Sequence, residues 1–208
     1  MTTGNANAEK LAAVLAFVLG APFAFMMVRS FAEGETRRHE VPLRAMLGDD
    51  TYEAFRDGEQ PKSHYYGNDR LAPDFTLTDQ SGQPWSLKAQ RGKTVVINFW
   101  TMTCQPCIEE MPSLEQLALV AAERDDLEVI AISTDKQWQD VNGLFKPGSK
   151  LKVLLDPDKA VVREKFGTRL YPETWVIDPE GVIRLRIDGA RDWSAPVALE
   201  MIERLSRS

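Results

Sequence analysis

Cysteine and histidine are nearly absent from the chain: two of each occur in 208 residues. This scarcity argues against a zinc site, which needs four ligands that are often supplied by paired clusters. Positive charge is not concentrated either. The 25 Lys and Arg residues are scattered, and 31 Asp and Glu residues bring the net charge to −6. The sequence therefore contains no basic cluster of the kind that binds nucleic acid.

Long uncharged stretches are also rare, and the exception lies near the N-terminus. Residues 11–28 contain no charged side chain, and their length is close to the minimum for a helix that crosses a bilayer. We predict that residues 1–28 form an N-terminal transmembrane helix that anchors the chain. The alternative is a cleaved signal peptide, because small residues surround Phe31 where a signal peptidase would cut.

The rest of the chain divides into two parts. Residues 29–70 are polar and irregular and contain both histidines, His39 and His64. We interpret this part as a linker with a small helical segment. From Leu71 to the C-terminus the hydrophobic pattern is regular, which predicts one folded domain over residues 71–208.

The pattern of that domain alternates between strands and helices. Residues 74–87 predict a β-hairpin that turns at Ser81-Gly82. The uninterrupted apolar run 94–100 predicts a buried central strand. Further strands are expected at 128–134, 151–156, 174–178 and 182–189, and helices at 104–123, 136–146, 158–167 and 194–208. This order predicts an α/β fold with a parallel sheet that antiparallel strands extend.

Both cysteines, Cys104 and Cys107, lie at the junction of the central strand and the following helix. A disulfide between them would close too small a loop to constrain the unfolded chain much. A metal site would lack further ligands nearby. A catalytic dithiol fits best, because the N-terminus of a helix stabilises a thiolate. We predict that Cys104 attacks a substrate disulfide and that Cys107 resolves the mixed disulfide.

Two segments, VVINFWTMTCQPCIEEMPSL and LYPETWVIDPEGVI, carry a family resemblance. Together they resemble the membrane-anchored TlpA/ResA-like thiol-disulfide oxidoreductases of the thioredoxin superfamily, over residues 71–208. The resemblance implies a thioredoxin-like fold with an added N-terminal β-hairpin. It also implies a protein disulfide reductase or oxidoreductase that uses the Cys104–Cys107 disulfide and needs neither cofactor nor metal.

The same resemblance assigns further residues to the site. Pro172 aligns with the cis-proline whose loop faces the dithiol and binds an extended substrate segment, and Tyr171 and Trp100 are assigned with it to substrate binding. Glu110 aligns with a partly buried acid that sets thiol pKa values and transfers protons. Asn98 replaces the buried aspartate of thioredoxins proper.

Partners and location follow from the chemistry and from the resemblance. A tethered disulfide reductase is most useful in an oxidising space. We therefore expect an anchor in a bacterial cytoplasmic membrane, with the catalytic domain facing the periplasm or exterior. Arginines after the apolar run oppose this orientation, but that rule is weak before a long domain. The resemblance implies a membrane thiol relay as electron donor and protein disulfides as substrates, with apocytochromes c among the candidates.

Two other functions are compatible with parts of the pattern. A peroxiredoxin-like thiol peroxidase would share the fold, and Thr101 matches its P-x-x-x-T-x-x-C signature, but Ile97 occupies the proline position. A non-catalytic, tethered client-binding module would need no thiol chemistry, so two intact cysteines argue against it.

Overall fold

The computed structural model describes residues 41, 43–45, 52, 71–145 and 148–205. Within these ranges no helix has both the length and the apolar character needed to cross a membrane. The predicted anchor at 1–28 and most of the predicted linker lie outside them. Of the linker, residues 41, 43–45 and 52 are helical, and Tyr52 is buried. The chain divides into two compact units, Met1–Arg44 and Ala45–Ser208. The fold described below is that of the second unit.

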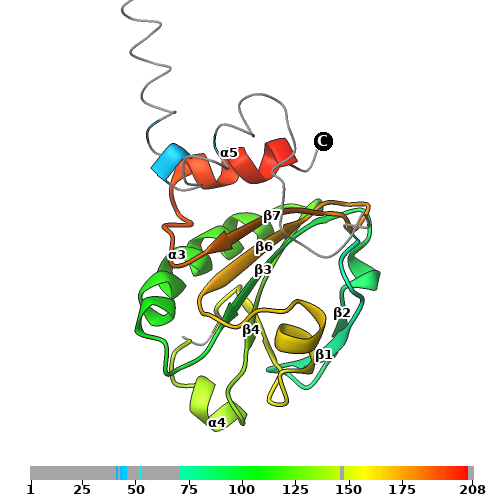
Figure 1. The fold of residues 1–208 in the computed structure, drawn as a ribbon, viewed down its shortest axis with the longest axis vertical. Coiled ribbons are helices and arrows are strands. Elements are labelled where there is room, and N and C mark those ends of the chain that lie inside the picture. Colours follow the sequence, from blue (N-terminus) through cyan, green and yellow to red (C-terminus); the bar gives the residue numbers. More distant parts are fainter. Residues whose placement is uncertain (1–40, 42, 46–51, 53–70, 146–147, 206–208) are drawn as a thin grey trace, which may run out of the picture. The chain divides into compact units, whose positions relative to one another are not determined.

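A single seven-stranded sheet forms the framework of this unit (Figure 1). Its strand order is β2-β1-β5-β4-β3-β6-β7. Strands β3, β4 and β5 are mutually parallel, whereas β6, β7, β1 and β2 run antiparallel to their neighbours. The strands are β1 (Thr76–Asp79), β2 (Pro84–Ser86), β3 (Thr94–Trp100), β4 (Leu127–Ser133), β5 (Lys152–Leu155), β6 (Glu173–Ile177) and β7 (Ile183–Asp188).

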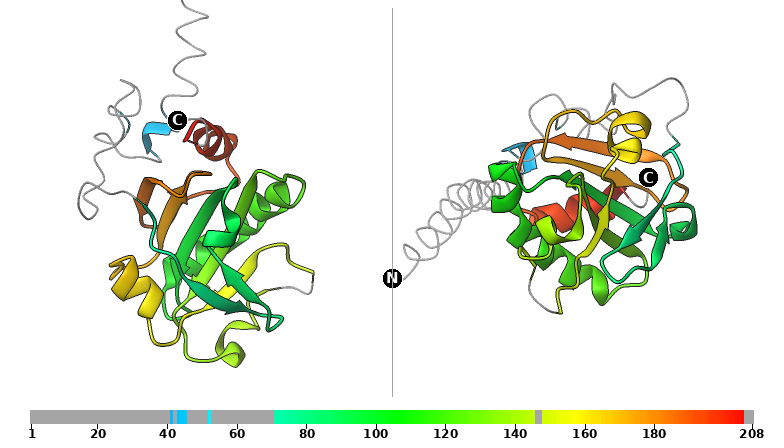
Figure 2. Two further views of the ribbon diagram at one scale, coloured as in Figure 1. Left: turned by 90° about the vertical axis from the view of Figure 1, so that its right-hand side faces the viewer. Right: turned by 90° about the horizontal axis from the view of Figure 1, so that it is seen from below.

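The helical elements lie on both faces of the sheet. The longest is α3 (Gln105–Ala122), and Figure 2 shows it on the opposite face from the short π-helical segment η2 (Ala160–Lys165). An ion pair of 2.5 Å between Arg124, just after α3, and Glu203 joins α3 to the last helix, α5 (Pro196–Leu205). The remaining elements are η1 (Lys88–Gln90) and α4 (Trp138–Val141).

Central strand β3 is buried along its whole length and separates two packed layers. Val95, Ile97 and Phe99 join the hydrophobic cluster under η2. Because side chains alternate along a strand, the residues between them point to the other face, where Asn98 contacts α3. The alternation of β3 therefore decides which of its side chains can reach the active-site helix.

The predicted order of elements is confirmed throughout the described domain, including the hairpin that β1 and β2 form around Gly82. Two predicted helices differ. The helix expected at 136–146 is only α4, because Asn142 and Gly143 follow it and disfavour helix. The helix expected at 158–167 is η2, whose first free N–H groups bind the buried Asp156 carboxylate rather than backbone carbonyls.

Candidate active site

The two cysteines form a disulfide at the start of α3, with an S–S distance of 2.10 Å. Cys104 is the N-cap residue, and its sulfur accepts a hydrogen bond from the backbone N–H of Cys107 at 3.3 Å. Pro106 lies in the first turn, where the helix needs no N–H from it. Cys104 is half-buried and Cys107 is fully buried. Only Cys104 is thus presented to a partner molecule.

The loop between β3 and α3 is held by an acid from the neighbouring strand. Asp135, just after β4, accepts hydrogen bonds from Thr101 Oγ1 and from the Met102 backbone N–H, each at 2.9 Å. Ser133 Oγ donates to the same carboxylate at 2.7 Å. The loop that leads into Cys104 is therefore tied to the end of β4.

Glu110 lies one turn beyond Cys107 and is 4% exposed. Its Oε1 accepts a hydrogen bond from Asn98 Nδ2 at 2.7 Å. Its Oε2 accepts from the Arg191 backbone N–H at 2.9 Å and from Trp193 Nε1 at 3.2 Å. Burial raises the pKa of the Glu110 carboxyl above its ordinary value, although these hydrogen bonds and the charge of Arg191 oppose the rise. The buried Glu110 carboxyl therefore keeps its proton to a higher pH than an exposed glutamate does.

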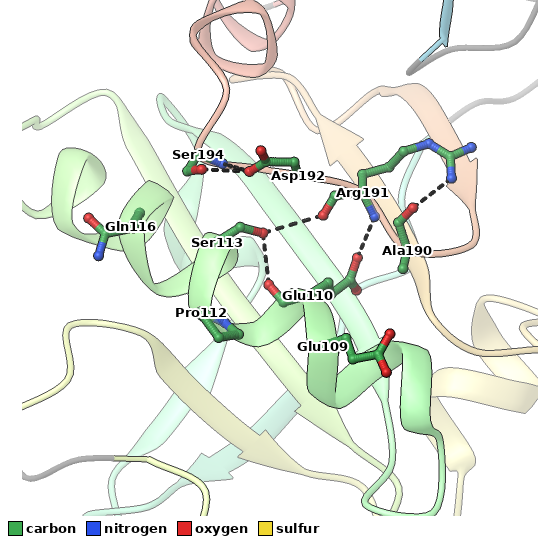
Figure 3. A pocket seen from close by; sticks show the side chains of 9 residues that line it. All are labelled: Glu109, Glu110, Pro112, Ser113, Gln116, Ala190, Arg191, Asp192 and Ser194. Atoms are coloured by element: carbon green, nitrogen blue, oxygen red, sulfur yellow. Dashed lines mark hydrogen bonds between the residues drawn. The ribbon is translucent and has the colours of Figure 1, made fainter.

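A cavity of about 530 Å³ opens between α3 and the segment after β7, with Glu110 in its wall (Figure 3). Ser113 bridges its two sides: its hydroxyl lies 2.8 Å from the Glu110 carbonyl oxygen and 3.3 Å from that of Arg191, and accepts from the Trp193 N–H at 3.1 Å. Pro112 lies within the helix here and leaves one turn without its usual N–H. The cavity is therefore lined by the buried acid and by polar residues of both α3 and the segment after β7.

The predicted cis-proline is confirmed, because the Tyr171–Pro172 peptide bond is cis. Glu173 pairs with Phe99 in the sheet, so the proline lies at the same end of the sheet as the dithiol loop. The Pro172 carbonyl accepts a hydrogen bond from the Gly189 N–H at 2.9 Å. Tyr171 is half-buried and packs against the hydrophobic cluster. Its role in substrate binding, like that of Pro172, stays a prediction.

The residue after the proline carries a buried carboxylate. Glu173 is 1% exposed and accepts hydrogen bonds from Trp175 Nε1 and Arg186 Nη2, each at 2.6 Å. The hydroxyl of Thr168 also donates to it. The Arg186 guanidinium lies 5.9 Å from the centre of the Trp175 ring. This network anchors the proline loop to the face of the sheet opposite α3.

The predicted substrate contact of Trp100 does not fit its position. Its side chain is 0% exposed and packs edge-on against Phe145, with ring centres 5.7 Å apart. Trp100 ends β3 on the same face as Asn98, because residues two apart on a strand share a face. Proximity in sequence to Cys104 therefore does not bring the indole to the surface, and Trp100 is a core residue.

Three residues of the site were missed by sequence reasoning. Asp135 had a usable signal, because a polar residue after one parallel strand lies at the same sheet edge as the loop after the next. Arg191 and Trp193 had none, since they are 81 and 83 residues from Glu110 in the chain. In the part of the chain described by the structure, no group of three or more His, Cys, Asp and Glu residues is placed to hold a metal ion.

These features define a class of protein. A half-buried sulfur caps a helix and is bonded to a buried sulfur one turn further on. The pair follows a central parallel strand, at the same end of the sheet as a cis-proline. This is a thioredoxin-like thiol-disulfide oxidoreductase.

Comparisons with known proteins specify the family. The family model described as AhpC/TSA family matches residues 69–186. ResA, a thiol-disulfide oxidoreductase from Bacillus subtilis (strain 168), is 30% identical over 142 residues, which are 68% of this chain and 76% of ResA. The chain therefore belongs to the AhpC/TSA family and, within it, to the ResA-like thiol-disulfide oxidoreductases.

Two further comparisons give one relative in sequence and one neighbour in fold. The thioredoxin-like protein YneN from the same organism is 36% identical over 116 residues, 54% of this chain and 66% of YneN. The crystal structure of a thiol:disulfide interchange protein of the thioredoxin family from Chlorobium tepidum TLS superposes with a TM-score of 0.55 at 24% identity. It covers 66% of this chain and 99% of that protein, and it shows the fold alone.

Proposed function

We propose that this oxidoreductase is tethered to a membrane and reduces disulfides of extracytoplasmic client proteins. The observation that carries the proposal is the unequal burial of the two sulfurs at the helix N-terminus, since Cys107 is 0% exposed and Cys104 is half-buried. A partly accessible attacking thiol beside a shielded resolving thiol is the arrangement that two-step disulfide exchange requires.

The reaction starts from the dithiol. The Cys104 thiolate attacks one sulfur of the client disulfide, forms a mixed disulfide and releases the other client sulfur, which takes up a proton. Cys107 then loses its proton and attacks the Cys104 sulfur, which releases the second client sulfur. The enzyme is left with the Cys104–Cys107 disulfide, and two electrons have passed to the client.

Glu110 is the group we assign to the proton of Cys107. It lies three residues further along α3, and both side chains are buried. A carboxyl whose pKa is raised by burial is able to accept a proton from a thiol and return it. It acts on the resolving step rather than on the first attack.

The thiol chemistry is tested by trapping the intermediate. The reduced Cys107→Ala protein, mixed with oxidised insulin, should accumulate a mixed disulfide through Cys104, whereas Cys104→Ala should accumulate none. The unchanged protein should release reduced insulin chains. If the reduced wild-type protein leaves insulin oxidised, the reductase function is wrong. A Cys104→Ala protein that retains full biological activity would favour the client-binding module instead.

The tether is tested separately. We propose that the apolar run 11–28 holds the chain in a bacterial cytoplasmic membrane, with residues 71–208 facing the periplasm or exterior. A reporter enzyme that works only outside the cytoplasm, fused after residue 208, should then be active and sediment with membranes. Activity in a soluble periplasmic fraction would favour a cleaved signal peptide, and its absence outside the cytoplasm would overturn the orientation.

The partners we propose are a membrane thiol relay, which resets the dithiol, and client proteins that include apocytochromes c. The name of the ResA relatives as thiol-disulfide oxidoreductases supports a protein disulfide substrate. A peptide with an oxidised Cys-x-x-Cys-His motif should be reduced faster than the same peptide with the His replaced by Ala. Equal rates would favour a general reductase.

A peroxidase remains the competing enzyme. The Thr101 hydroxyl of the peroxiredoxin-like signature donates to Asp135 in this structure, and Ile97 is a fully buried core residue. These contacts favour disulfide exchange over peroxide reduction. Hydrogen peroxide consumption by the reduced protein, compared with its rate on oxidised insulin, decides between the two.

A further inference from the structure

Asp135 binds the loop that precedes Cys104 through both of its carboxylate oxygens. It is half-buried at the end of β4, and both of its carboxylate oxygens are used. Oδ1 accepts from Thr101 Oγ1 at 2.9 Å, while Oδ2 accepts from the Met102 N–H at 2.9 Å and from Ser133 Oγ at 2.7 Å. Two of these three donors belong to the loop that precedes Cys104.

The hold on the loop extends to Cys104 itself. The Cys104 N–H donates to the Thr101 carbonyl at 3.1 Å, so a turn connects the residue bound by Asp135 to the cysteine. On the other side of the loop, the Thr134 N–H donates to the Trp100 carbonyl at 3.1 Å. The segment from Trp100 to Cys104 is thus held by the two residues that follow β4 and by its own turn.

We infer that Asp135 is a positioning residue for Cys104: by holding Thr101 and Met102 it keeps the Cys104 sulfur at the N-terminus of α3. The inference rests on the proposed role of Cys104 as the attacking thiol. A sulfur held there accepts the Cys107 N–H and lies in the positive end of the helix dipole, which stabilises the thiolate. A loop that drifts away from β4 loses that stabilisation.

Position and charge can be separated by substitution. Asp135→Asn removes the charge but can keep every contact, because its oxygen can accept from Met102 and Ser133 while its amide donates to Thr101, whose hydroxyl also accepts. Asp135→Ala removes the charge and all three contacts. If Asp135 acted through its negative charge, both variants would lower the pKa of the Cys104 thiol. If it acts by positioning, Ala should raise that pKa and Asn should not.

The experiment measures the alkylation rate of Cys104 by iodoacetamide in the reduced proteins as a function of pH, together with the rate of insulin reduction. We expect the alkylation midpoint of Asp135→Ala to move to higher pH and its reduction rate to fall roughly 10- to 100-fold, the loss expected when a reacting group is misplaced. Asp135→Asn should restore both towards wild type. Asp140→Ala is the matched control, since Asp140 is an exposed acid on α4 that accepts from Gln137 Nε2 at 3.3 Å.

The outcomes are distinct. An unchanged midpoint in Asp135→Ala, or a shift to lower pH in both variants, overturns the positioning role. A wild-type protein that fails to reduce insulin overturns the proposed function, while the alkylation midpoints still test the position of the sulfur. Should Asp135→Ala fail to unfold cooperatively, Thr101→Val removes one donor and keeps the side-chain shape. An upward shift in that variant supports the inference, and no shift contradicts it.

Discussion

Asn98 of the central strand donates a hydrogen bond from Nδ2 to Oε1 of Glu110 on the active-site helix at 2.7 Å. The same amide nitrogen lies 2.9 Å from Thr174 Oγ1. The strand position at which thioredoxins proper have a buried aspartate therefore contacts the helix position at which this chain has its acid.

Replacing Glu110 by Gln should lower the apparent pKa of the thiols in the reduced protein. An ionised carboxylate near the dithiol disfavours a second negative charge, so its removal favours the thiolate. Resolution by Cys107 should slow, because the proton acceptor is lost. Thiolate absorbance during a pH titration measures the first effect, and decay of the mixed disulfide the second. Superimposable titrations with equal rates would contradict both.

Glu110 should also make stability depend on pH. In the unfolded chain its pKa is near the ordinary 4.5, and burial raises it in the folded protein. The folded state thus binds its proton more tightly, which contributes stability below pH 4.5 that is lost as pH rises through the folded pKa. In oxidised protein, the unfolding free energy of wild type minus that of Glu110→Gln should decrease as the pH rises from 4.5 through the folded pKa. Urea denaturation at several pH values tests it, and a flat difference would refute it.

Alkylation of the reduced protein near neutral pH should label Cys104 well before Cys107. The reason is geometric, since Cys104 is half-buried at the N-cap whereas Cys107 is 0% exposed. Mass spectrometry after a brief exposure to iodoacetamide identifies the labelled residue. Faster labelling of Cys107 would reverse the two roles, and urea-unfolded protein, in which both should react, is the control.

The ion pair behind the proline loop should respond unequally to loss of its two partners. Glu173 is 1% exposed at its side chain, whereas Arg186 is 29% exposed and also lies 2.9 Å from Asp188. Arg186→Met leaves a buried carboxylate without its cation, which costs about 3–5 kcal/mol. Glu173→Gln leaves an arginine that retains Asp188 and solvent, and the lost hydrogen bond between charged groups costs about 1.5–3 kcal/mol. Denaturant midpoints of the two variants measure the order, and equal losses would contradict the argument.

The parts of the fold that depend on local pattern were predictable. The strand at Thr94–Trp100 was predicted with the bounds that the structure gives, because a largely apolar run of strand length, rich in β-branched and aromatic residues, favours a buried strand. The dithiol followed from the two cysteines at the end of that strand, and the cis-proline at Pro172 followed from the family resemblance. Contacts between distant segments were not predictable, since nothing around Arg191 marks its N–H as a partner of Glu110. The prediction that Trp100 contacts substrate was wrong, because nearness in sequence to Cys104 does not decide which face of the strand the side chain takes.

The hydrogen-bond donors of Glu110 also determine the order in which the site is completed during synthesis of the chain. A chain made from its N-terminus completes the Cys104–Cys107 segment long before it reaches Arg191, which lies 81 residues beyond Glu110. A nascent chain that has not yet added the segment after β7 contains both thiols but lacks two of the three donors that hold the acid beside them. If Glu110 handles the Cys107 proton as we propose, such a fragment would resolve mixed disulfides less well than the finished enzyme.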